Sequence, residues 1–316
     1  MLIATEQKLY NLPTQQNPEK PRLLLNSDGL QAVAEAGELI VVAERQGKIR
    51  IGHGSELEIV NGTGIEERIT SLLIINIDPF ILLVGTEPPQ IYRIIGNKYV
   101  TGRMIFFEDL ECRKDWFTPW GGPPAVRSMA EGQIGNVYAD IHVGSIMRSW
   151  NSGYTWEPVN PQLNKDVHQV NTTPAAPERV YANTADAVWI SYDQGNSWHQ
   201  RPFPHDVTYG RAIAVHPDDP DCILASVSEG PHGENVQGRL FRTDDAGLHW
   251  QHVTTGFPPY TTANINTHQV VFDNCGVAWA AVADSLYRSH DCGKTWNNVW
   301  QAPAAIELLS QQKRLY

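Results

Sequence analysis

Cysteine is scarce in this chain of 316 residues, and its four copies, Cys112, Cys222, Cys275 and Cys292, form no Cys-x-x-Cys pair. This spacing argues against a dense disulfide framework, so we expect reduced and mostly buried thiols in a cytoplasmic protein. No stretch approaches the roughly 18 apolar residues of a membrane-spanning helix. The first residues, MLIATEQKLYNL, lack the basic and apolar regions of a secretory signal peptide.

Positively charged residues are also few. Lys and Arg number 24 against 35 Asp and Glu, which gives a net charge of −11. Such a balance disfavours binding to a phosphate backbone, so we expect neither nucleic acid nor membrane as a partner. With 41% hydrophobic residues the chain can build a packed core, and the partner that we expect is a small-molecule substrate or ligand.

One short pattern, Ser/Thr-x-Asp/Asn-x-Gly-x-x-Trp, is present four times. The Asp or Asn can accept hydrogen bonds from its own turn, the glycine permits a positive φ, and the tryptophan packs on a neighbouring strand. The tryptophans, at 156, 198, 250 and 296, are 42, 52 and 46 residues apart, a repeat long enough for about four strands. The four copies are SWNSGYTW (149–156), SYDQGNSW (191–198), TDDAGLHW (243–250) and SHDCGKTW (289–296).

These four stretches resemble the Asp-box, or BNR, repeat of sialidase-like β-propellers in the WD40/YVTN/BNR-like superfamily, and they cover the second half of the chain. The resemblance implies the fold but says little about activity, because the repeat occurs in glycosidases, sorting receptors, assembly factors and lyases. It also implies that the active site lies on the face opposite the Asp boxes.

Runs rich in Val, Ile, Leu and Tyr group into six blades with an incomplete seventh at the N-terminus, and AIELLSQ near the C-terminus can fill that gap. We therefore predict an all-β, seven-bladed β-propeller with four-stranded antiparallel blades, in which N- and C-terminal strands share one blade and close the ring. Six blades with a loose N-terminal segment is the alternative. The predicted single domain, 1–316, divides into blade 1 (1–26 plus 304–316), blade 2 (27–64), blade 3 (65–100), an insertion loop (101–124), blade 4 (125–163), blade 5 (164–204), blade 6 (205–258) and blade 7 (259–303).

The insertion at 101–124 is rich in aromatic residues, among them Trp116 and Trp120. It is either a packed connection around a degenerate turn, EDLECRKDW, or an aromatic loop over one end of the channel. Long irregular insertions in compact domains are often functional. We therefore include both tryptophans among the candidate ligand-binding residues.

The starts of four predicted first strands, VRSM, VHQV, GRAI and THQV, align Arg127, His168, Arg211 and His268 in one column. Buried charge is costly unless it is paired or serves a ligand, so we expect these side chains to line an axial funnel. The alternative is structural, with each arginine paired to a carboxylate and each histidine bonded to a backbone carbonyl. The equivalent positions in the other blades are predicted to be Gln31, Thr70 and Ile306.

The candidate catalytic residues are His142, His168, Arg211 and His268, because imidazoles suit proton transfer near neutral pH and arginine suits an anion. His142 ends a second strand, and a register slip of one residue would turn it to the other side. The histidines 142, 168, 232 and 268 could also converge on zinc, copper or iron, although no local metal motif is present. The candidate ligand-binding residues are Arg127, Tyr209, Glu229, His232, Trp116 and Trp120.

These residues favour an enzyme of hydrolase or lyase type that acts on a small anionic or carbonyl-bearing substrate in the Arg/His-lined funnel, on the face opposite the Asp boxes. The alternative is a non-catalytic ligand-binding or assembly-scaffold propeller. A true sialidase is disfavoured, since the chain contains no Arg-Ile-Pro motif.

Overall fold

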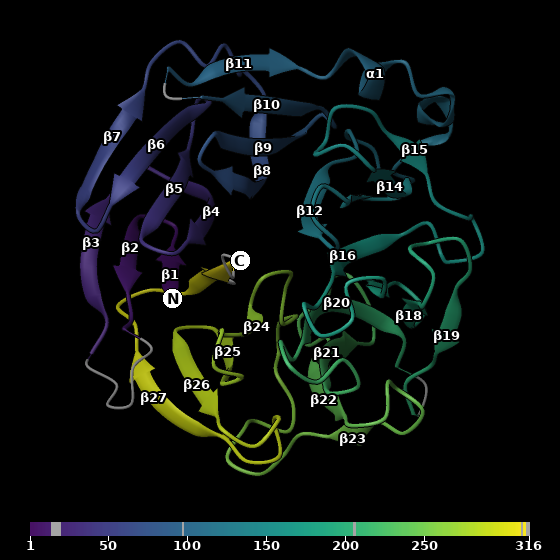
Figure 1. Cartoon of the computed structure of the whole chain (residues 1–316). Coiled ribbons are helices and arrows are strands. Elements are labelled where there is room, and N and C mark those ends of the chain that lie inside the picture. Colours follow the sequence, from purple (N-terminus) through teal and green to yellow (C-terminus); the bar gives the residue numbers. More distant parts are fainter. Residues whose placement is uncertain (14–19, 97, 205–206, 311, 314–316) are drawn as a thin grey trace. The chain divides into compact units, whose positions relative to one another are not determined.

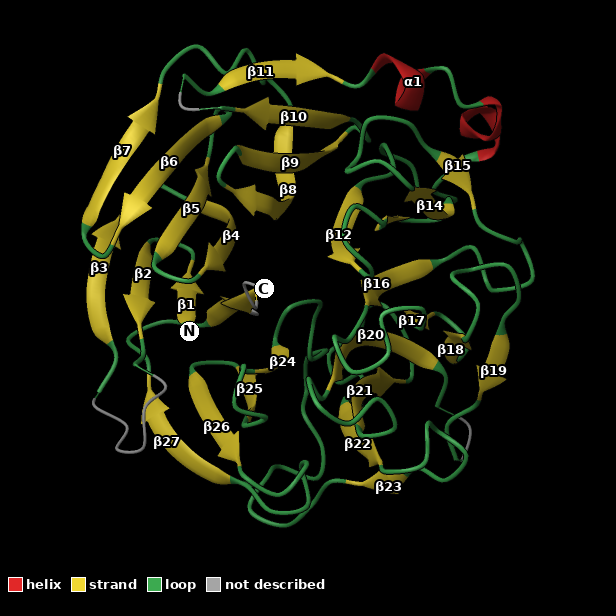
Figure 2. Ribbon diagram, in the orientation of Figure 1, coloured by secondary structure: helices red, strands yellow, loops and turns green. Residues whose placement is uncertain are grey.

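The strands form seven sheets in a computed structural model that describes residues 1–13, 20–96, 98–204, 207–310 and 312–313 (Figures 1 and 2). The fold is an all-β, seven-bladed β-propeller built from four-stranded antiparallel blades, as the sequence predicts. The chain divides into two compact units, unit 1 with Met1–Val159 and Ser310–Tyr316, and unit 2 with Asn160–Leu309.

Unit 1 holds the sheets of the first half of the chain. Their central strands, such as FILLVGTE at 80–87, are buried on both faces and are therefore almost continuously apolar. The first sheet contains β1 (Leu2–Thr5), β2 (Lys8–Asn11) and β3 (Arg22–Asn26) from the N-terminal residues, and the second contains β4 (Leu30–Ala36), β5 (Leu39–Glu44), β6 (Lys48–His53) and β7 (Glu56–Val60). The third sheet contains β8 (Arg68–Ile77), β9 (Phe80–Glu87), β10 (Ile91–Ile95) and β11 (Val100–Arg103). The fourth sheet contains β12 (Val126–Glu131), β13 (Val137–Ile141), β14 (Ser145–Ser149) and β15 (Glu157–Pro158).

Unit 2 repeats the same four-strand order three times. Its inner and central strands are also buried on both faces, which forms apolar layers between successive sheets. The first of these sheets contains β16 (Val167–Asn171), β17 (Val180–Thr184), β18 (Val188–Ser191) and β19 (His199–Arg201), and the second contains β20 (Tyr209–Val215), β21 (Ile223–Ser228), β22 (Arg239–Thr243) and β23 (Gln251–His252). The third contains β24 (Val270–Phe272), β25 (Ala278–Val282), β26 (Ser285–Ser289) and β27 (Asn297–Gln301). The strand β28 (Ile306–Leu309) follows in the chain.

The four repeat turns, at 149–156, 191–198, 243–250 and 289–296, share one hydrogen-bond pattern. The hydroxyl of the first residue accepts the glycine N–H at 2.7 to 3.1 Å. The Asp or Asn side chain accepts the N–H four residues further on at 2.8 to 2.9 Å. In the third turn the hydrogen bond from the Thr243 hydroxyl, helped by His249, lowers the pKa of Asp245 to about 2. The acceptor therefore stays charged across the neutral range.

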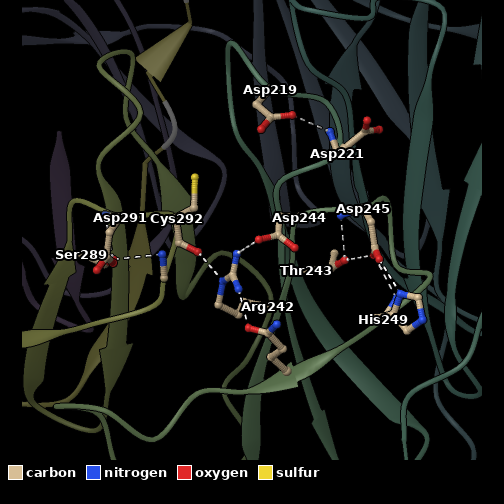
Figure 3. A network of polar contacts seen from close by, with 12 residues as sticks. Asp219, Asp221, Arg242, Thr243, Asp244, Asp245, His249, Ser289, Asp291 and Cys292 are labelled. Carbon is tan, nitrogen blue, oxygen red and sulfur yellow. Dashed lines mark hydrogen bonds and ion pairs between the residues drawn. The ribbon is translucent and has the colours of Figure 1, made fainter.

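Within unit 2 each later turn is held by an arginine of the preceding sheet. Arg201 Nε donates to the Ala246 carbonyl at 3.0 Å, and Arg242 Nε donates to the Cys292 carbonyl at 2.9 Å (Figure 3). In both cases the acceptor is the residue before the turn glycine. The repeat turns thus close their own hairpins and also fix successive sheets of this unit to one another.

The C-terminal residues of unit 1 bond to its first two sheets. Ser310 donates its N–H to the Leu2 carbonyl at 3.0 Å, and its hydroxyl contacts the buried carboxylate of Glu35. Beyond it, β29 (Gln312–Lys313) pairs in parallel with β4, which makes the second sheet five-stranded. The ends of the chain therefore share sheets as predicted, whereas the parallel pairing with the second sheet is not anticipated from the sequence.

We expect Trp296→Ala to lower the free energy of unfolding by about 3–5 kcal/mol, the usual effect of truncating a buried aromatic side chain. Trp296 is buried in the core cluster of unit 2 and donates to the Gly293 carbonyl at 3.0 Å. Trp150→Ala is the control, because Trp150 is 44% exposed, and its loss should change stability by less than about 1 kcal/mol. Equal effects of the two substitutions in chemical denaturation would contradict this assignment.

We expect Ser310→Ala to destabilise the protein by about 1–3 kcal/mol, because the buried Glu35 carboxylate loses a hydrogen-bond donor and the Leu2 N–H loses an acceptor at 2.7 Å. Ser55→Ala, at an exposed position of the second sheet, serves as the matched control. Urea denaturation of both variants measures the difference. An unchanged midpoint for Ser310→Ala would show that the C-terminal contacts contribute nothing to stability.

Candidate functional site

The predicted column of polar residues coincides with irregularities in the inner strands. The register shifts between Val126 and Met129 in β12, between Val167 and Gln169 in β16, and between Gly210 and Ile213 in β20. A bulge adds a residue to one strand and re-aims the side chains beside it. Arg127, His168 and Arg211 all lie at these bulges, and β4 and β8 have corresponding shifts at Gln31 and Thr70.

His268 departs from this column. It precedes β24 rather than lying within it, and its φ of 65° is left-handed. Its backbone N–H donates to Gln169 Oε1 at 3.2 Å, and its carbonyl accepts from the Leu309 N–H at 2.8 Å. The backbone of His268 therefore serves the packing of unit 2, and His268 lies before its strand rather than at a bulge within it. The aligned register of VHQV and THQV holds, because Val170 pairs with Ala182 and Val270 pairs with Ala280.

His168 is completely buried and its imidazole is held at both ring nitrogens. Nδ1 lies 2.5 Å from the Gly210 carbonyl oxygen. A carbonyl can only accept, so Nδ1 carries a hydrogen. Nε2 lies 3.1 Å from the Tyr209 hydroxyl and 3.2 Å from Asp166 Oδ1.

The Tyr209 hydroxyl and the Asp166 carboxylate can bond to Nε2 in different protonation states of the His168 ring. A neutral ring accepts a hydrogen bond from the Tyr209 hydroxyl, whereas a protonated ring donates to the Asp166 carboxylate. His168 can therefore take up a proton that Tyr209 releases, while Asp166 balances the charge. This is the arrangement of a proton-transfer relay.

Arg211 adds a positive charge beside this relay. Its guanidinium lies over the Tyr209 ring, 5.0 Å from the centroid, and the Tyr209 ring lies 4.7 Å from that of His168. Nη2 is 3.5 Å from the Pro231 carbonyl, and Nε has no hydrogen-bond partner within the described ranges. The guanidinium therefore keeps donor capacity for an anionic or carbonyl group. Asp166, His168, Tyr209 and Arg211 are called the unit 2 cluster below.

Glu229 and His232 are exposed on the segment between β21 and β22. The same segment contributes the Pro231 carbonyl that faces Arg211, and Asn264 Nδ2 donates to the Gly230 carbonyl at 3.2 Å. These bonds place the segment beside the unit 2 cluster. The structure thus brings together His168, Tyr209 and Arg211 from the predicted set, with Glu229 and His232 on an adjoining segment.

The remaining candidates, His142, Arg127, Trp116 and Trp120, belong to unit 1. The insertion contains α1 (Ile105–Glu108) and a 3-10 turn (Glu111–Asp115). Trp116 packs at 5.6 Å from the fully buried ring of Phe107, so this part of the insertion is a packed connection. Trp120 is 58% exposed, and its ring lies 5.1 Å from that of the buried His142. The packed connection therefore describes the part of the insertion around Trp116, whereas the role of Trp120 in ligand binding stays a prediction.

Two residues near the predicted sites were missed by sequence reasoning. Asp166 lies two residues before His168, and an Asp-x-His pattern at a strand start would have been the signal. Asp140 is fully buried in β13, where it accepts the Ser128 N–H at 2.5 Å, and burial raises its pKa to about 7. Its signal was the alignment of VYAD with VYAN, which pairs Asp140 with the buried Asn183.

A metal would find two suitable ligands in unit 2. Asp166 Oδ1 and His168 Nε2 are 3.2 Å apart, and carboxylate and imidazole are donors that zinc and other transition metals accept. His232, a predicted third imidazole, is exposed on the adjoining segment. A bound transition metal stays a prediction, which metal analysis of the purified protein would test.

Fold and site together define a seven-bladed β-propeller with an Asp–His–Tyr–Arg cluster at inner-strand bulges of unit 2. A family model described as "Sortilin, neurotensin receptor 3" matches residues 144–272. A xyloglucanase from Paenibacillus sp. is 26% identical over 208 residues, which are 52% of this chain and 20% of that protein. Xyloglucanase Xgh74A of Acetivibrio thermocellus is 26% identical over 215 residues, 54% of this chain and 25% of that protein. The chain thus spans a fifth to a quarter of the length of these relatives.

Solved structures share the fold at low sequence identity. An ancestral GH74 enzyme superimposes with a TM-score of 0.67 and 15% identity, covering 94% of this chain and 40% of the other. YCF48 bound to D1 peptide gives a TM-score of 0.57 and 13% identity, covering 85% of this chain and 81% of the other. The chain therefore shares the β-propeller fold of these structures and is similar in sequence to xyloglucanases over about half of its length. Among the described residues, no helix is both long enough and apolar enough to span a membrane.

Asp140 makes stability depend on pH in a defined direction. Its pKa of about 7 in the folded protein exceeds the usual carboxyl value, so the folded state binds the proton more tightly than the unfolded state. The free energy of unfolding should fall as the pH rises from about 4 to about 7, and this contribution should be constant above that range. Asp140→Asn keeps the acceptor for the Ser128 N–H and should remove this slope.

Thermal unfolding at a series of pH values measures the effect. Asp115→Asn is the control, because Asp115 is an exposed aspartate of the same unit. A pH profile of Asp140→Asn that parallels the unmodified protein would overturn the assignment of a neutral buried carboxyl group to Asp140.

Proposed function

We propose that the chain is a hydrolase whose site is the unit 2 cluster, and that its substrate carries an anionic or carbonyl group beside the bond to be cleaved. The observation that supports this most directly is the position of His168 Nε2 between the Tyr209 hydroxyl and the Asp166 carboxylate, at 3.1 and 3.2 Å. Such a relay is useful to an enzyme that moves protons at neutral pH. We also propose a cytoplasmic location, which the four free thiols favour.

Each residue of the cluster has a separate part in this proposal. Arg211 binds the anionic or carbonyl group of the substrate through its guanidinium, which lies over the Tyr209 ring. Tyr209, which is half-buried, exchanges a proton with the substrate, and His168 takes up or returns that proton through Nε2. Asp166 stabilises the protonated imidazole, and the Gly210 carbonyl holds the ring in place. The cluster thus binds the substrate and moves its proton without rearrangement of the inner strands.

The relatives suggest a substrate class. Their name states an action on xyloglucan, and a carbohydrate that carries a carboxylate would combine sugar chemistry with the charge of Arg211. Most glycoside hydrolases use two carboxyl groups, about 5 to 10 Å apart. The unit 2 cluster contains one carboxylate, Asp166, so an acidic sugar bound by Arg211 agrees with it better than neutral xyloglucan does.

The second candidate is a non-catalytic binding propeller, because this chain covers a larger share of a peptide-bound propeller than of the GH74 enzymes. Three GH74 structures are covered over 40%, 52% and 64% of their lengths, whereas YCF48 bound to D1 peptide is covered over 81%. A propeller of matching length that binds a peptide favours a binding role for a chain of this size. Isothermal titration with anionic peptides separates this candidate from the hydrolase, since such a protein would bind without turnover.

We expect Tyr209→Phe to lower kcat by about 10²-fold or more and to leave KM within a few-fold, because it removes the hydroxyl and keeps the ring under Arg211. Arg211→Gln should instead raise KM about tenfold for an acidic substrate and little for a neutral one. The assay uses nitrophenyl glucuronide and glucoside, oligogalacturonate and xyloglucan.

His249→Ala provides the control, since His249 is an exposed residue of the third repeat turn. Absence of turnover on every substrate, together with tight binding of an anionic peptide, would refute the hydrolase and support the second candidate. Equal loss of kcat on acidic and neutral substrates in Arg211→Gln would refute the role given to Arg211.

A further inference from the structure

Two cysteines of unit 2 belong to one hydrophobic cluster. Cys222 is fully buried immediately before β21, and Cys292 is half-buried in the fourth repeat turn, between β26 and β27. The proposed function uses neither thiol. The cluster also contains Leu224 and Trp296, so residues of two neighbouring sheets contribute to one apolar layer that includes both cysteines.

Independent contacts fix the fourth repeat turn against β21. A Cβ atom at Gly293 would lie 2.5 Å from Leu224 Cδ2, so the turn backbone lies directly on that side chain. Residues 222 and 224 share a face of the strand, because side chains alternate. Arg242, which pairs with Leu224 in the same sheet, also holds the turn, because its Nε donates to the Cys292 carbonyl at 2.9 Å (Figure 3). The turn that carries Cys292 therefore lies against the segment that carries Cys222.

The two thiols also have unequal acidity. The hydrogen bond from the Cys222 thiol lowers the pKa of Cys292 to about 7, and Arg242 and Lys294 act in the same direction, whereas burial and the charge of Asp219 oppose it. That same bond, together with burial, raises the pKa of Cys222. Cys292 is therefore the nucleophile of the pair at neutral pH, and Cys222 keeps its proton.

We propose that Cys222 and Cys292 form a reversible disulfide when the protein meets a hydroperoxide, which makes the pair a redox-sensitive modification site. The Cys292 thiolate attacks the outer oxygen of the peroxide, the O–O bond breaks, and the products are a Cys292 sulfenic acid and hydroxide, or an alkoxide from an organic peroxide. The Cys222 sulfur then attacks the Cys292 sulfur. The S–O bond breaks, and the leaving hydroxyl departs as water with the Cys222 proton.

The bond would join the sheet of β20–β23 to the sheet of β24–β27 where the repeat turn already packs. Closing a long loop of chain restricts the unfolded state more than the folded one. We therefore expect oxidation to raise the Tm by about 5–10 °C, because the site of the bond is already assembled. A thiol reductant such as dithiothreitol should reverse the shift.

The experiment treats the full chain with an equimolar amount of hydrogen peroxide, alkylates the remaining thiols and maps the peptides by mass spectrometry. The expected product is a linked pair of peptides containing Cys222 and Cys292, with the loss of two hydrogens. Cys275→Ser, which removes an exposed thiol, should leave this product unchanged. Cys292→Ser should abolish it and leave Cys222 reduced.

The Cys222→Ala variant tests the order of the steps, since its Cys292 sulfenic acid has no resolving thiol and should be trapped by dimedone. If that variant fails to fold, peptide mapping of the unmodified chain still decides the matter. Oxidation of Cys275 before the pair, or conversion of Cys292 to sulfinic acid without linkage to Cys222, would overturn the proposal.

Discussion

The hydrogen bond between a turn glycine and the hydroxyl two residues before an Asp or Asn is the interaction on which the repeated architecture depends. It closes the outer hairpin at Gly153, Gly195, Gly247 and Gly293. A closed turn presents its carbonyl to an arginine of the preceding sheet, as Arg201 and Arg242 show in unit 2. The hydrogen bonds within each turn therefore also position the carbonyl that binds the preceding sheet.

Bulges in the inner strands serve a different purpose. A regular strand would bury every second side chain against its neighbours, whereas the extra residue at His168 or Arg211 is released from the ladder. The same bulge leaves the Gly210 carbonyl available to His168 Nδ1. One backbone irregularity therefore orients both the arginine and the imidazole, which explains why polar residues collect at this point of each sheet.

Several ionisable groups are buried, which costs free energy unless the charge is paired or removed by protonation. The buried carboxylate of Glu35 accepts a hydrogen bond from Ser310, and the partly buried carboxylate of Glu131 pairs with Lys313, so residues near the C-terminus satisfy two acidic groups of unit 1. Asp140 is instead protonated at pH values below about 7, because burial raises its pKa to about 7. In the pair of Cys222 and Cys292, the Cys222 thiol lowers the pKa of the Cys292 thiol.

The sequence alone determined the repeat, the seven blades and the repeat-turn contacts, because these depend on residues that are close in the chain and have one favoured geometry. It also identified His168, Tyr209 and Arg211, since their strands align. It could not supply the contact between the Tyr209 hydroxyl and His168 Nε2, nor the left-handed backbone of His268, because these follow from packing between strands that are about 40 to 100 residues apart. Asp166 is close to His168 in the chain, and its Asp-x-His pattern was overlooked. The pairing of Cys222 with Cys292 was likewise decided by the tertiary structure, because the two residues meet only when one sheet packs on the next.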